Sequence, residues 1–410
     1  MTAKSTAMSP SPNETDHDLR LIVIGNPENR RVQLFSDAAA RRGRCGIVVV
    51  SWLDFLRDSD ALISRLASDA VLRIESPGEN FEVERELLML GSEDMSDGGH
   101  AQISREEIRT LKFQRGRVLA MRQWYCGWQR ALARIEECLA GIPGCRVMNP
   151  PEDIAAMFDK ARCHQVFREH GVPVPPLMGT PGSFSELREM MSARNFRRIF
   201  LKPCHSSSAS GVVALECSAH SMQAFSSIEL VREHGEVQLF NSLKVRRYSG
   251  VRAIAELIDA VCRERSLAEV WLPKAGFDGR RFDLRVVVIA GCAAHVVVRQ
   301  SSGPMTNLHL GNRRGDMPRL RERMGEVNWK TAMTTCERAS AAFPRSLYTA
   351  VDLLVAPSFR RVAVAEVNAF GDLLPNVLHD GQDTYSAELA ALGDSTPRNT
   401  PVLQVSTIGL

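Results

Sequence analysis

The sequence predicts an α/β protein in which an open α/β domain precedes a larger α/β unit, and three observations support this fold class. The apolar runs at 21–25 and 46–52 flank a helix-like stretch at 32–42, which together make a strand, helix, strand unit. Prolines at 150 and 151 then interrupt the pattern before a new helical stretch begins. After that break, apolar strand-like runs recur, so we expect the second half to build a sheet of its own.

The N-terminal unit continues with a strand that runs into a turn at 71–78 and with a helix at 83–90. Arg73 and Glu75 stand on that strand, where they either face a substrate or mark a solvated strand end, and we favour the solvated strand end. The first strand ends in Gly25 alone, which does not make the GxGxxG dinucleotide fingerprint. The sequence therefore predicts no nicotinamide cofactor.

The second unit opens with a helix at 152–170 and continues with a strand at 198–202 that runs into a serine-rich loop. Two more strands are expected within 269–298, and the last two at 350–355 and 361–367.

These patterns divide the chain into four parts. Residues 1–18 and 393–410 are rich in Ser, Thr, Pro and Asn, and we expect them to be disordered or flexible tails. Between them we expect an N-terminal α/β domain at 19–148 and a second unit at 149–392.

Composition argues against several classes of protein. The formal charge of +3 comes from 51 basic and 48 acidic residues, too even a balance for the basic surface that nucleic-acid binding needs. No run approaches the roughly 18 apolar residues of a membrane span. The ten cysteines form neither a CxxC pair nor a zinc-type spacing. We therefore predict a cytoplasmic protein with neither nucleic acid nor membrane as a partner, and the oligomeric state stays open.

The first candidate for chemistry is Lys202, which ends an apolar strand ahead of a loop of small residues. Backbone amides and hydroxyls of such a loop can cradle phosphates, while the lysine adds a positive charge. Taken alone, an ordinary strand end followed by a polar loop is the simpler interpretation. The loop residues of interest are Ser206, Ser207, Ser208, Ser210 and Gly211.

The second candidate is a group of oxygen ligands near the C-terminus. Glu366 and Asn368 stand two apart on one strand, so they share a face, and Asp352 lies on the preceding strand. Two carboxylates and an amide oxygen suit magnesium, with phosphate oxygens completing the shell. The alternative is a sheet face whose polar residues are simply solvated, and the pattern alone leaves both interpretations open.

The third candidate is a strand on which Asp283 and Arg285 share a face, followed by Arg299 at a strand end and by Asn307 in a turn. An arginine pair near a transferring phosphoryl group would stabilise its negative charge. The alternative is a surface salt bridge at Asp283, which contributes little to stability.

In this order along the chain, the features resemble the ATP-grasp superfamily, and they are most similar to the ribosomal-protein glutamate ligases and related carboxylate–amine ligases. The resemblance covers roughly 149–378 and implies a two-subdomain ATP-grasp fold behind an N-terminal α/β domain of the pre-ATP-grasp type. It identifies Lys160 and Lys202 as phosphate-contacting lysines. It also implies a hinge at 269–272 whose backbone bonds the adenine edge, formed by Glu269, Val270, Trp271 and Leu272.

The same resemblance implies roles for the polar residues and the cofactors ATP and Mg²⁺, with Mn²⁺ as an alternative metal. Asp283 would lie near the nucleotide and Asn307 near its phosphates, while Arg285 and Arg299 would act as catalytic residues at the phosphoryl-transfer centre. The metal ligands it implies are Asp352, Glu366 and Asn368.

Three positions depart from the family pattern. Val270 stands where relatives commonly carry glutamate, and Met305 where some carry a basic residue. The stretch at 218–266, which includes the basic residues at 244–247, is longer than usual. It is either a substrate-facing insertion or a solvated charged loop, and the loop is the commoner meaning of such a run.

The activity implied by the resemblance is an ATP-dependent ligase that joins a small-molecule or peptide carboxylate to an amine through an acylphosphate, with release of ADP and phosphate. Two alternatives stay open: a small-molecule kinase on the same scaffold, and an ATP-binding protein without turnover.

Overall fold

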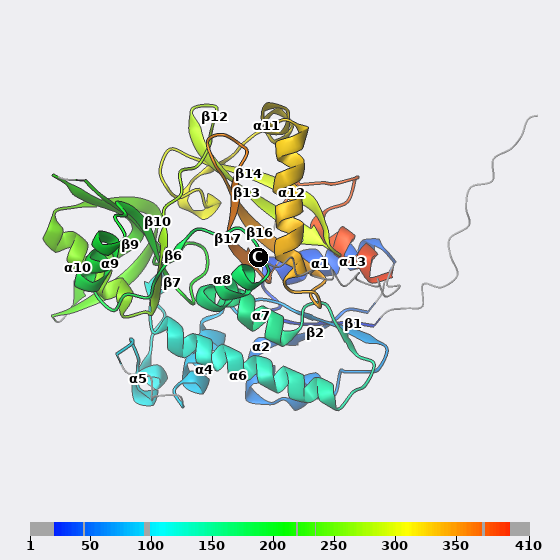
Figure 1. The fold of residues 1–410 in the computed structure, drawn as a ribbon. Coiled ribbons are helices and arrows are strands. Elements are labelled where there is room, and N and C mark those ends of the chain that lie inside the picture. The colour runs from blue at the N-terminus through cyan, green and yellow to red at the C-terminus, as the bar shows by residue number, and fades with distance from the viewer. Residues whose placement is uncertain are drawn as a thin grey trace, which may run out of the picture.

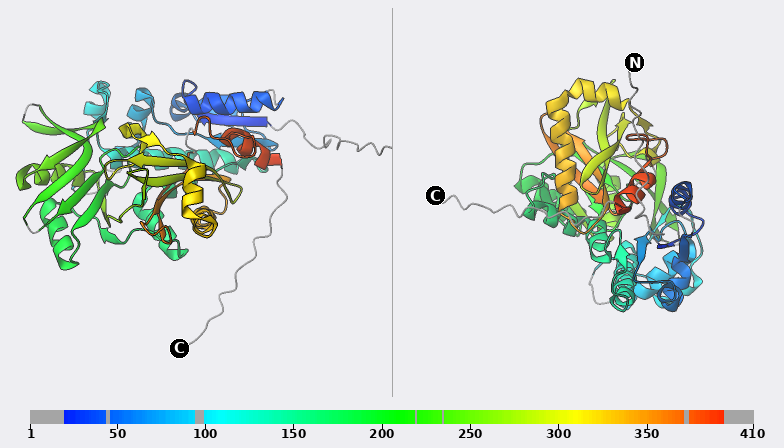
Figure 2. Two further views of the ribbon diagram at one scale, coloured as in Figure 1. Left: turned by 90° about the horizontal axis from the view of Figure 1, so that it is seen from above. Right: turned by 90° about the vertical axis from the view of Figure 1, so that its right-hand side faces the viewer.

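The computed structural model describes residues 20–43, 46–93, 99–218, 220–233, 235–370 and 374–393. These residues form three sheets with helices packed around them (Figures 1 and 2). The expected tails at 1–18 and 393–410 lie outside the described residues, except for Gly393, which ends a helix.

The N-terminal sheet is parallel and has the strand order β2-β1-β3-β5. Its strands are β1 (Arg20–Gly25), β2 (Val48–Ser51), β3 (Ala70–Ile74) and β5 (Arg146–Val147). Its helices are α1 (Arg30–Arg41), α2 (Trp52–Arg57), α3 (Asp60–Ile63), α4 (Phe81–Gly91), α5 (Arg105–Thr110) and α6 (Met121–Ala140). The predicted strand, helix, strand opening is confirmed: β1 is buried along nearly its whole length, as expected for a strand of a parallel sheet that is covered on both faces.

The second sheet has the order β4-β10-β9-β8-β7-β11-β6. Its strands are β4 (Arg117–Val118), β6 (Leu177–Gly179), β7 (Arg198–Pro203), β8 (Val213–Cys217), β9 (Met222–Glu233), β10 (Glu236–Ser249) and β11 (Ser266–Val270). Helices α9 (Phe184–Ala193) and α10 (Val251–Cys262) share a buried apolar core with it. Figure 1 shows this green part set to one side of the molecule.

The stretch at 218–266 is not the solvated charged loop that was the commoner expectation, and its role as a substrate-facing insertion stays a prediction. It supplies β9, β10 and α10, and the basic residues at 244–247 lie on β10, exposed. The ladder between β9 and β10 is long and antiparallel, with a bulge between Asn241 and Arg246. The high charge of this run hid its strand character, because one face of the hairpin is solvated.

The third sheet has the order β15-β14-β13-β16-β17, with β12 paired to β13. Its strands are β12 (Gly276–Phe277), β13 (Arg280–Ile289), β14 (Cys292–Ser301), β15 (Arg313–Arg314), β16 (Tyr348–Val355) and β17 (Val362–Asn368). The helical elements of this part are η1 (Leu308–Leu310), α11 (Met317–Met324), α12 (Glu326–Ala341) and α13 (Thr384–Gly393). Figure 2 shows α13, in red, beside the blue α1, so the two ends of the described chain meet.

The N-terminal sheet and the third sheet share an apolar core. Val23 of β1 and Val71 of β3 belong to the same buried cluster as Val287 of β13 and Leu389 of α13. This packing places the N-terminal unit directly against the sheet that carries the predicted metal ligands.

The helix expected at 152–170 is two helices, α7 (Pro151–Phe158) and α8 (Lys160–Glu169). Asp159 interrupts them with an extended backbone, φ −82° and ψ 104°. Its side chain accepts hydrogen bonds from the backbone N–H groups of Ala161 and Arg162, so it caps the start of α8. A local cap therefore decides the break, and it makes Lys160 the first residue of a new helix.

The interpretation of Arg73 and Glu75 as a solvated strand end is wrong. Both side chains are buried, and Arg73 Nε lies 2.8 Å from Glu75 Oε1. Arg73 Nη1 lies 2.5 Å from Glu388 Oε2 on α13. Because α13 covers this strand, the charges pair with each other rather than with water.

Candidate functional site

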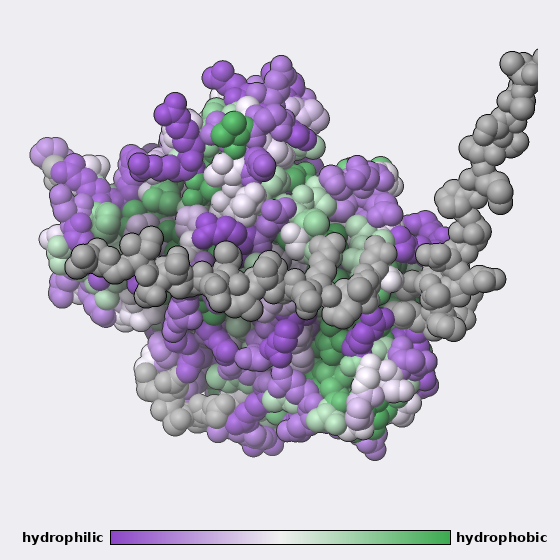
Figure 3. All heavy atoms as spheres, turned by 45° about the vertical axis from the view of Figure 1, so that its right-hand side comes forward, coloured by the Kyte–Doolittle hydropathy of each residue, from purple (hydrophilic) through white to green (hydrophobic). Residues whose placement is uncertain are grey.

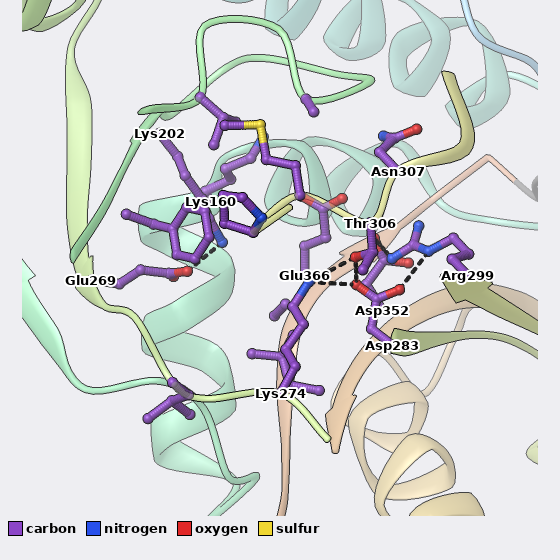
Figure 4. Close-up of a pocket in the computed structure, with 18 of the residues that line it drawn as sticks. Lys160, Lys202, Glu269, Lys274, Asp283, Arg299, Thr306, Asn307, Asp352 and Glu366 are labelled. Atoms are coloured by element: carbon purple, nitrogen blue, oxygen red, sulfur yellow. Dashed lines mark hydrogen bonds and ion pairs between the residues drawn. The ribbon is translucent and has the colours of Figure 1, made fainter. Parts of the chain in front are cut away.

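The main candidate site is a pocket between the second and third sheets, beside the start of α8 (Figure 4). Its empty space is about 750 Å³, a volume that includes the part open to solvent. Its polar lining residues are Lys160, Lys202, Ser206, Glu269, Lys274, Asp283, Arg299, Thr306, Asn307, Asp352 and Glu366. Its apolar lining residues are Phe200, Ala209, Val212, Val270, Leu272, Pro304, Met305, Leu354 and Ala365.

Two lysines reach the pocket from different elements. Strand alternation on β7 buries Ile199 and Leu201 in the core and turns Phe200 and Lys202 to the pocket face. Lys202 forms an ion pair with Glu269, and although burial opposes it, this pair raises the pKa of Lys202. Both predicted phosphate lysines therefore line one pocket, as Figure 4 shows for Lys202 and Lys160.

Lys160 is held by the segment that follows β7. Its backbone N–H donates to Cys204 O at 3.1 Å, and its Nζ donates to Ser206 O. Burial lowers the pKa of Lys160, with Glu366 opposing this effect. A lysine in such a place is ready to receive an anion, because only part of its positive charge is offset by protein groups.

Two of the three predicted metal ligands face each other. Asp352 on β16 and Glu366 on β17 are register partners in the antiparallel ladder, next to a bulge. Burial, together with the like charge of Glu366, raises the pKa of Asp352 to about 7 despite two neighbouring arginines. Lys160 and Lys202 lower the pKa of Glu366 to about 2, although burial opposes them. The two carboxyl groups therefore resist ionising together.

The third predicted ligand, Asn368, stands apart from this pair. It lies opposite Ala350 in the ladder and does not line the pocket. Its Nδ2 donates to Ala350 O at 3.3 Å. Strand alternation puts Asn368 on the same face as Glu366, but two residues further along β17.

The arginines form a chain of ion pairs along the pocket wall. Arg299 Nε lies 2.8 Å from Asp283 Oδ1, and Arg299 Nη2 lies 3.0 Å from Asp352 Oδ2. Arg285 Nε lies 2.9 Å from Asp352 Oδ1. Arg299 lines the pocket and Arg285 does not, so the structure brings only one of the two predicted catalytic arginines to its surface.

Lys274 and Thr306 also belong to this chain of contacts, and neither was among the site residues predicted from the sequence. Lys274 Nζ lies 3.0 Å from Asp283 Oδ2 and 2.7 Å from Thr306 Oγ1. Thr306 also donates to Asp283, which fixes the turn that carries Asn307. The position of Lys274 just past the predicted hinge was the one available signal, but its partners are remote in sequence.

The serine-rich loop reaches the pocket at fewer points than the sequence suggests. Ser206 lines the pocket, whereas Ser207 and Ser208 are exposed and Ser210 is half-buried outside the lining. Gly211 does not line it either. At Gly211, φ is +77° and a Cβ would lie 2.6 Å from Pro203 Cγ, so this turn requires glycine. From this loop Ser206 and Ala209 line the pocket, so the loop presents a single serine there rather than a row of hydroxyls.

The predicted hinge lies along one edge of the pocket. Glu269, Val270 and Leu272 line it, but Trp271 turns away and packs on Phe200, with ring centroids 5.2 Å apart. The N–H groups of Val270 and Trp271 already donate to Pro176 O and Arg198 O. Within the described ranges, the backbone N–H of Leu272 donates to no other backbone group. It is therefore available as a donor to a ligand.

The residues present fit a nucleotide with a divalent cation. The pocket is apolar near Phe200 and Leu272 and charged near the two lysines and the two carboxyl groups. A divalent cation between Asp352 and Glu366 would relieve the repulsion that raises the pKa of Asp352. Among the residues that the structure describes, no group of three or more His, Cys, Asp or Glu side chains is placed to hold a metal.

Two observations concern the rest of the surface. No helix within the described ranges is long and apolar enough to cross a membrane. Figure 3 shows mostly hydrophilic residues on the face in view, with hydrophobic residues in smaller groups between them.

Comparisons of sequence find no relative: no family model matches the chain, and no curated protein matches it. Solved structures do match. A crystal structure of D-cycloserine synthetase DcsG is 14% identical, covers 91% of this chain and 98% of its own, and has a TM-score of 0.50. The ADP complex of purK, an N5-carboxyaminoimidazole ribonucleotide synthetase, is 10% identical, covers 88% of this chain and 72% of its own, and also has a TM-score of 0.50.

A structure of the ATP-grasp ligase PsnB with a minimal precursor is 15% identical, covers 91% of this chain and 99% of its own, and has a TM-score of 0.48. At such low identities, structural similarity shows the fold alone. The two structures with a TM-score of 0.50 cover 91% and 88% of this chain. They confirm the fold class that the order of motifs predicted. The chain has the ATP-grasp fold.

Proposed function

We propose that this protein is an ATP-dependent ligase that joins a carboxylate to an amine. The observation that carries the proposal is the charged end of the pocket, where Lys160 and Lys202 lie across from Asp352 and Glu366. Lysines at that end suit phosphates, and the carboxylates suit the divalent cation that accompanies them. A magnesium nucleotide requires both: cations for its phosphate oxygens and oxygen ligands for its metal.

In this proposal the adenine occupies the apolar end of the pocket. Phe200, Val212 and Leu354 provide walls for the ring, and the free N–H of Leu272 donates to its edge. Contact through the backbone explains why valine is tolerated at Val270. The phosphates extend toward Lys160 and Lys202, and Mg²⁺ is held by Asp352 and Glu366, supplying positive charge at the phosphates.

The proposed reaction has two steps. An oxygen of the substrate carboxylate attacks the terminal phosphorus of ATP, the bond to ADP breaks, and an acylphosphate forms. The amine then attacks the acyl carbon, phosphate leaves with the bonding electrons, and the amine loses a proton to give an amide. The protein contributes position and charge, as phosphoryl transfer generally requires.

Arg299 is the chain's own candidate for stabilising charge in both steps. Although burial opposes it, Asp283 and then Asp352 raise the pKa of its guanidinium, so it stays charged at any working pH. Arg285 does not line the pocket, and we assign it the role of holding Asp352 in place. Asn307 and Thr306 border the same end of the pocket, on a turn fixed by Asp283.

The proposed substrates are small-molecule or peptide carboxylates and amines, and the proposed compartment is the cytoplasm. Cysteines within the described residues are free thiols, which suits a reducing environment. The proposed domain division stays at 19–148 and 149–392, although β4 of the first half joins the second sheet through β10.

The test is calorimetric titration of Mg-ATP into the wild-type chain and into two single variants, Glu366→Ala and Asn368→Ala. We expect Glu366→Ala to lose magnesium-dependent affinity and Asn368→Ala to keep most of it, because only Glu366 lines the pocket. Repeating the titration without metal, and with Mn²⁺, separates the metal site from the nucleotide site. Equal binding by all three proteins would exclude the assigned metal site.

Release of products separates a ligase from a kinase. A screen of amino acids and short peptides should produce ADP and free phosphate together, and only when both a carboxylate and an amine are present. ADP without phosphate would identify a kinase instead. Binding without any turnover across the screen would point to a nucleotide-binding protein.

A further inference from the structure

His205 is a buried side chain beside the pocket that the proposed reaction does not use. It lies between Cys204 and Ser206, and only 3% of its surface is exposed. Its ring stacks on Tyr125 of α6, with centroids 4.0 Å apart and planes inclined by 9°. Tyr125 is itself anchored, because its hydroxyl donates to Ala155 O at 2.9 Å. The imidazole is therefore held in one orientation by the N-terminal half of the chain.

The ring makes one directed contact, to the residue that begins α8. His205 Nε2 lies 3.2 Å from Asp159 Oδ2. A carboxylate only accepts hydrogen bonds, so the proton must be on Nε2. Burial lowers the pKa of His205, while the hydrogen bond from His205 helps to lower the pKa of Asp159 to about 2 against the effect of burial. The pair is a neutral imidazole that donates to a charged carboxylate.

Asp159 uses its other oxygen to start the helix that begins with Lys160. Asp159 Oδ1 accepts from Ala161 N at 2.9 Å and from Arg162 N at 3.2 Å. One carboxylate therefore connects His205 to the first turn of α8. Arg265 also lies near this carboxylate, but its side chain is partly exposed and its Nη1 is 3.7 Å from Asp159 Oδ2. Of these two side chains, His205 therefore makes the shorter contact with Asp159.

The three consecutive residues 204–206 all form hydrogen bonds with Asp159 or Lys160. Cys204 O accepts from the backbone N–H of Lys160, Ser206 O accepts from its Nζ, and His205 between them bonds Asp159. Both the backbone and the ammonium group of Lys160 therefore depend on where the segment 204–206 lies. The side chain that fixes this segment against α8 is His205.

We propose that His205 is a positioning residue that keeps Lys160 directed at the nucleotide phosphates, by holding the segment 204–206 against the Asp159 cap. The inference rests on the proposed function, because it concerns the same phosphate end of the pocket. It also gives α6 a role at that end, since Tyr125 supports the imidazole. His205 touches no reacting group in this scheme and acts only through Lys160.

The first experiment compares two variants that each keep one property of the ring. His205→Phe keeps the stacking on Tyr125 and loses the hydrogen bond, whereas His205→Gln keeps a donor and loses the stacking. We expect His205→Phe to weaken Mg-ATP binding about tenfold and His205→Gln to restore it to within about threefold of wild type, since a hydrogen bond to a charged group is at stake.

His295→Phe is the matched control. His295 on β14 is also buried, its Nε2 lies 2.9 Å from Gln382 O, and its ring packs edge-on against that of His379. None of these three residues lines the pocket. His295→Phe should lose about as much stability as His205→Phe, but it should keep the wild-type affinity for Mg-ATP. Thermal unfolding and near-ultraviolet circular dichroism check that all variants keep the fold.

The decisive experiment is a pair of double-variant cycles. In a Lys160→Met background, His205→Phe should cause no further loss of affinity, because the group it positions is gone. In a Lys202→Met background, the full tenfold loss should remain. Equal losses in both backgrounds, or an unchanged affinity for His205→Phe alone, would overturn the positioning role while leaving Mg-ATP binding by the wild type intact. Failure of the wild type to bind Mg-ATP would instead remove the proposed function and this inference with it.

Discussion

Two buried ionic clusters in this protein each pair one arginine with two carboxylates, and they lie in different surroundings. In the first, Arg73 pairs with Glu75 and Glu388, and the rings of Phe35 and Tyr348 lie over its guanidinium at 4.3 and 4.8 Å. In the second, Arg299 pairs with Asp283 and Asp352 along the wall of an open pocket. The first cluster is closed on every side, and the second has one side open to a ligand.

The difference shows how surroundings decide what a buried charge does. A closed cluster can only hold elements together, and Arg73 joins β3 to α13, which are 315 residues apart in the chain. A cluster beside a pocket can exchange partners, because an entering phosphate or cation can replace a protein group. Burying charge costs free energy in both places, and in each cluster the pairing of opposite charges offsets that cost.

The largest effect is expected from breaking the closed cluster. Arg73→Met leaves two carboxyl groups buried without a cation, and removal of one partner from such a cluster costs about 3–5 kcal/mol. We expect a loss of that size in the free energy of unfolding at pH 8, measured by chemical denaturation.

Arg41→Met is its matched control. Arg41 also joins α1 to the start of α13, through an exposed ion pair with Asp383 at 2.7 Å. Exposed pairs of this kind contribute about 0–1 kcal/mol. Similar losses for both variants would contradict the distinction between a buried cluster and a surface pair.

The second effect is expected from the open cluster and concerns function. Asp352→Asn should reduce magnesium-dependent turnover about 100- to 1,000-fold, the range seen when one preorganised electrostatic group is removed from a site. Its loss of stability should be smaller than that of Arg73→Met, because burial already disfavours the charge on Asp352. A large loss of stability with normal turnover would reverse the comparison.

The third effect is a pH dependence of the closed cluster. Burial raises the pKa of Glu388 to about 7, although Arg73 opposes it, whereas its ordinary value is 4.5. Between these values the folded state binds more protons than the unfolded state, so this group makes the free energy of unfolding fall as pH rises. We expect Glu388→Gln to lack this fall, and therefore to gain stability relative to wild type between pH 5 and pH 8.

Denaturation of both proteins at a series of pH values measures that difference. Other groups with raised pKa values, Asp352 and Glu264 among them, contribute equally to both proteins and cancel. Parallel curves for the two proteins would show that Glu388 keeps its charge when the protein folds.

The smallest effect is expected in the serine-rich loop. The double variant Ser207→Ala, Ser208→Ala should change Mg-ATP affinity less than twofold and stability by less than about 0.5 kcal/mol, because both side chains are exposed. Gly211→Ala is the contrasting variant, since its Cβ would collide with Pro203 and the backbone φ of +77° disfavours alanine. A large loss of Mg-ATP affinity in the serine double variant would show that these hydroxyls do bind the phosphates.

Much of the site followed from local patterns alone. Alternation on β7 placed Lys202 on the pocket face, and the spacing of Glu366 and Asn368 correctly put them on one face of β17. The order of the motifs resembles the ATP-grasp superfamily, and this resemblance implied the ATP-grasp fold. These features depend on strand period and on short segments, which a sequence records directly.

The tertiary structure decided the rest, because it depends on pairs that are far apart in the chain. Arg73 is buried because α13 covers it, and Lys274 belongs to the site because it meets Asp283 and Thr306. Asn368 is offset from the pocket because the ladder pairs it with Ala350 rather than with Asp352. Periodicity in a sequence predicts which face a side chain occupies, whereas its partner across that face is chosen only when distant segments pack together.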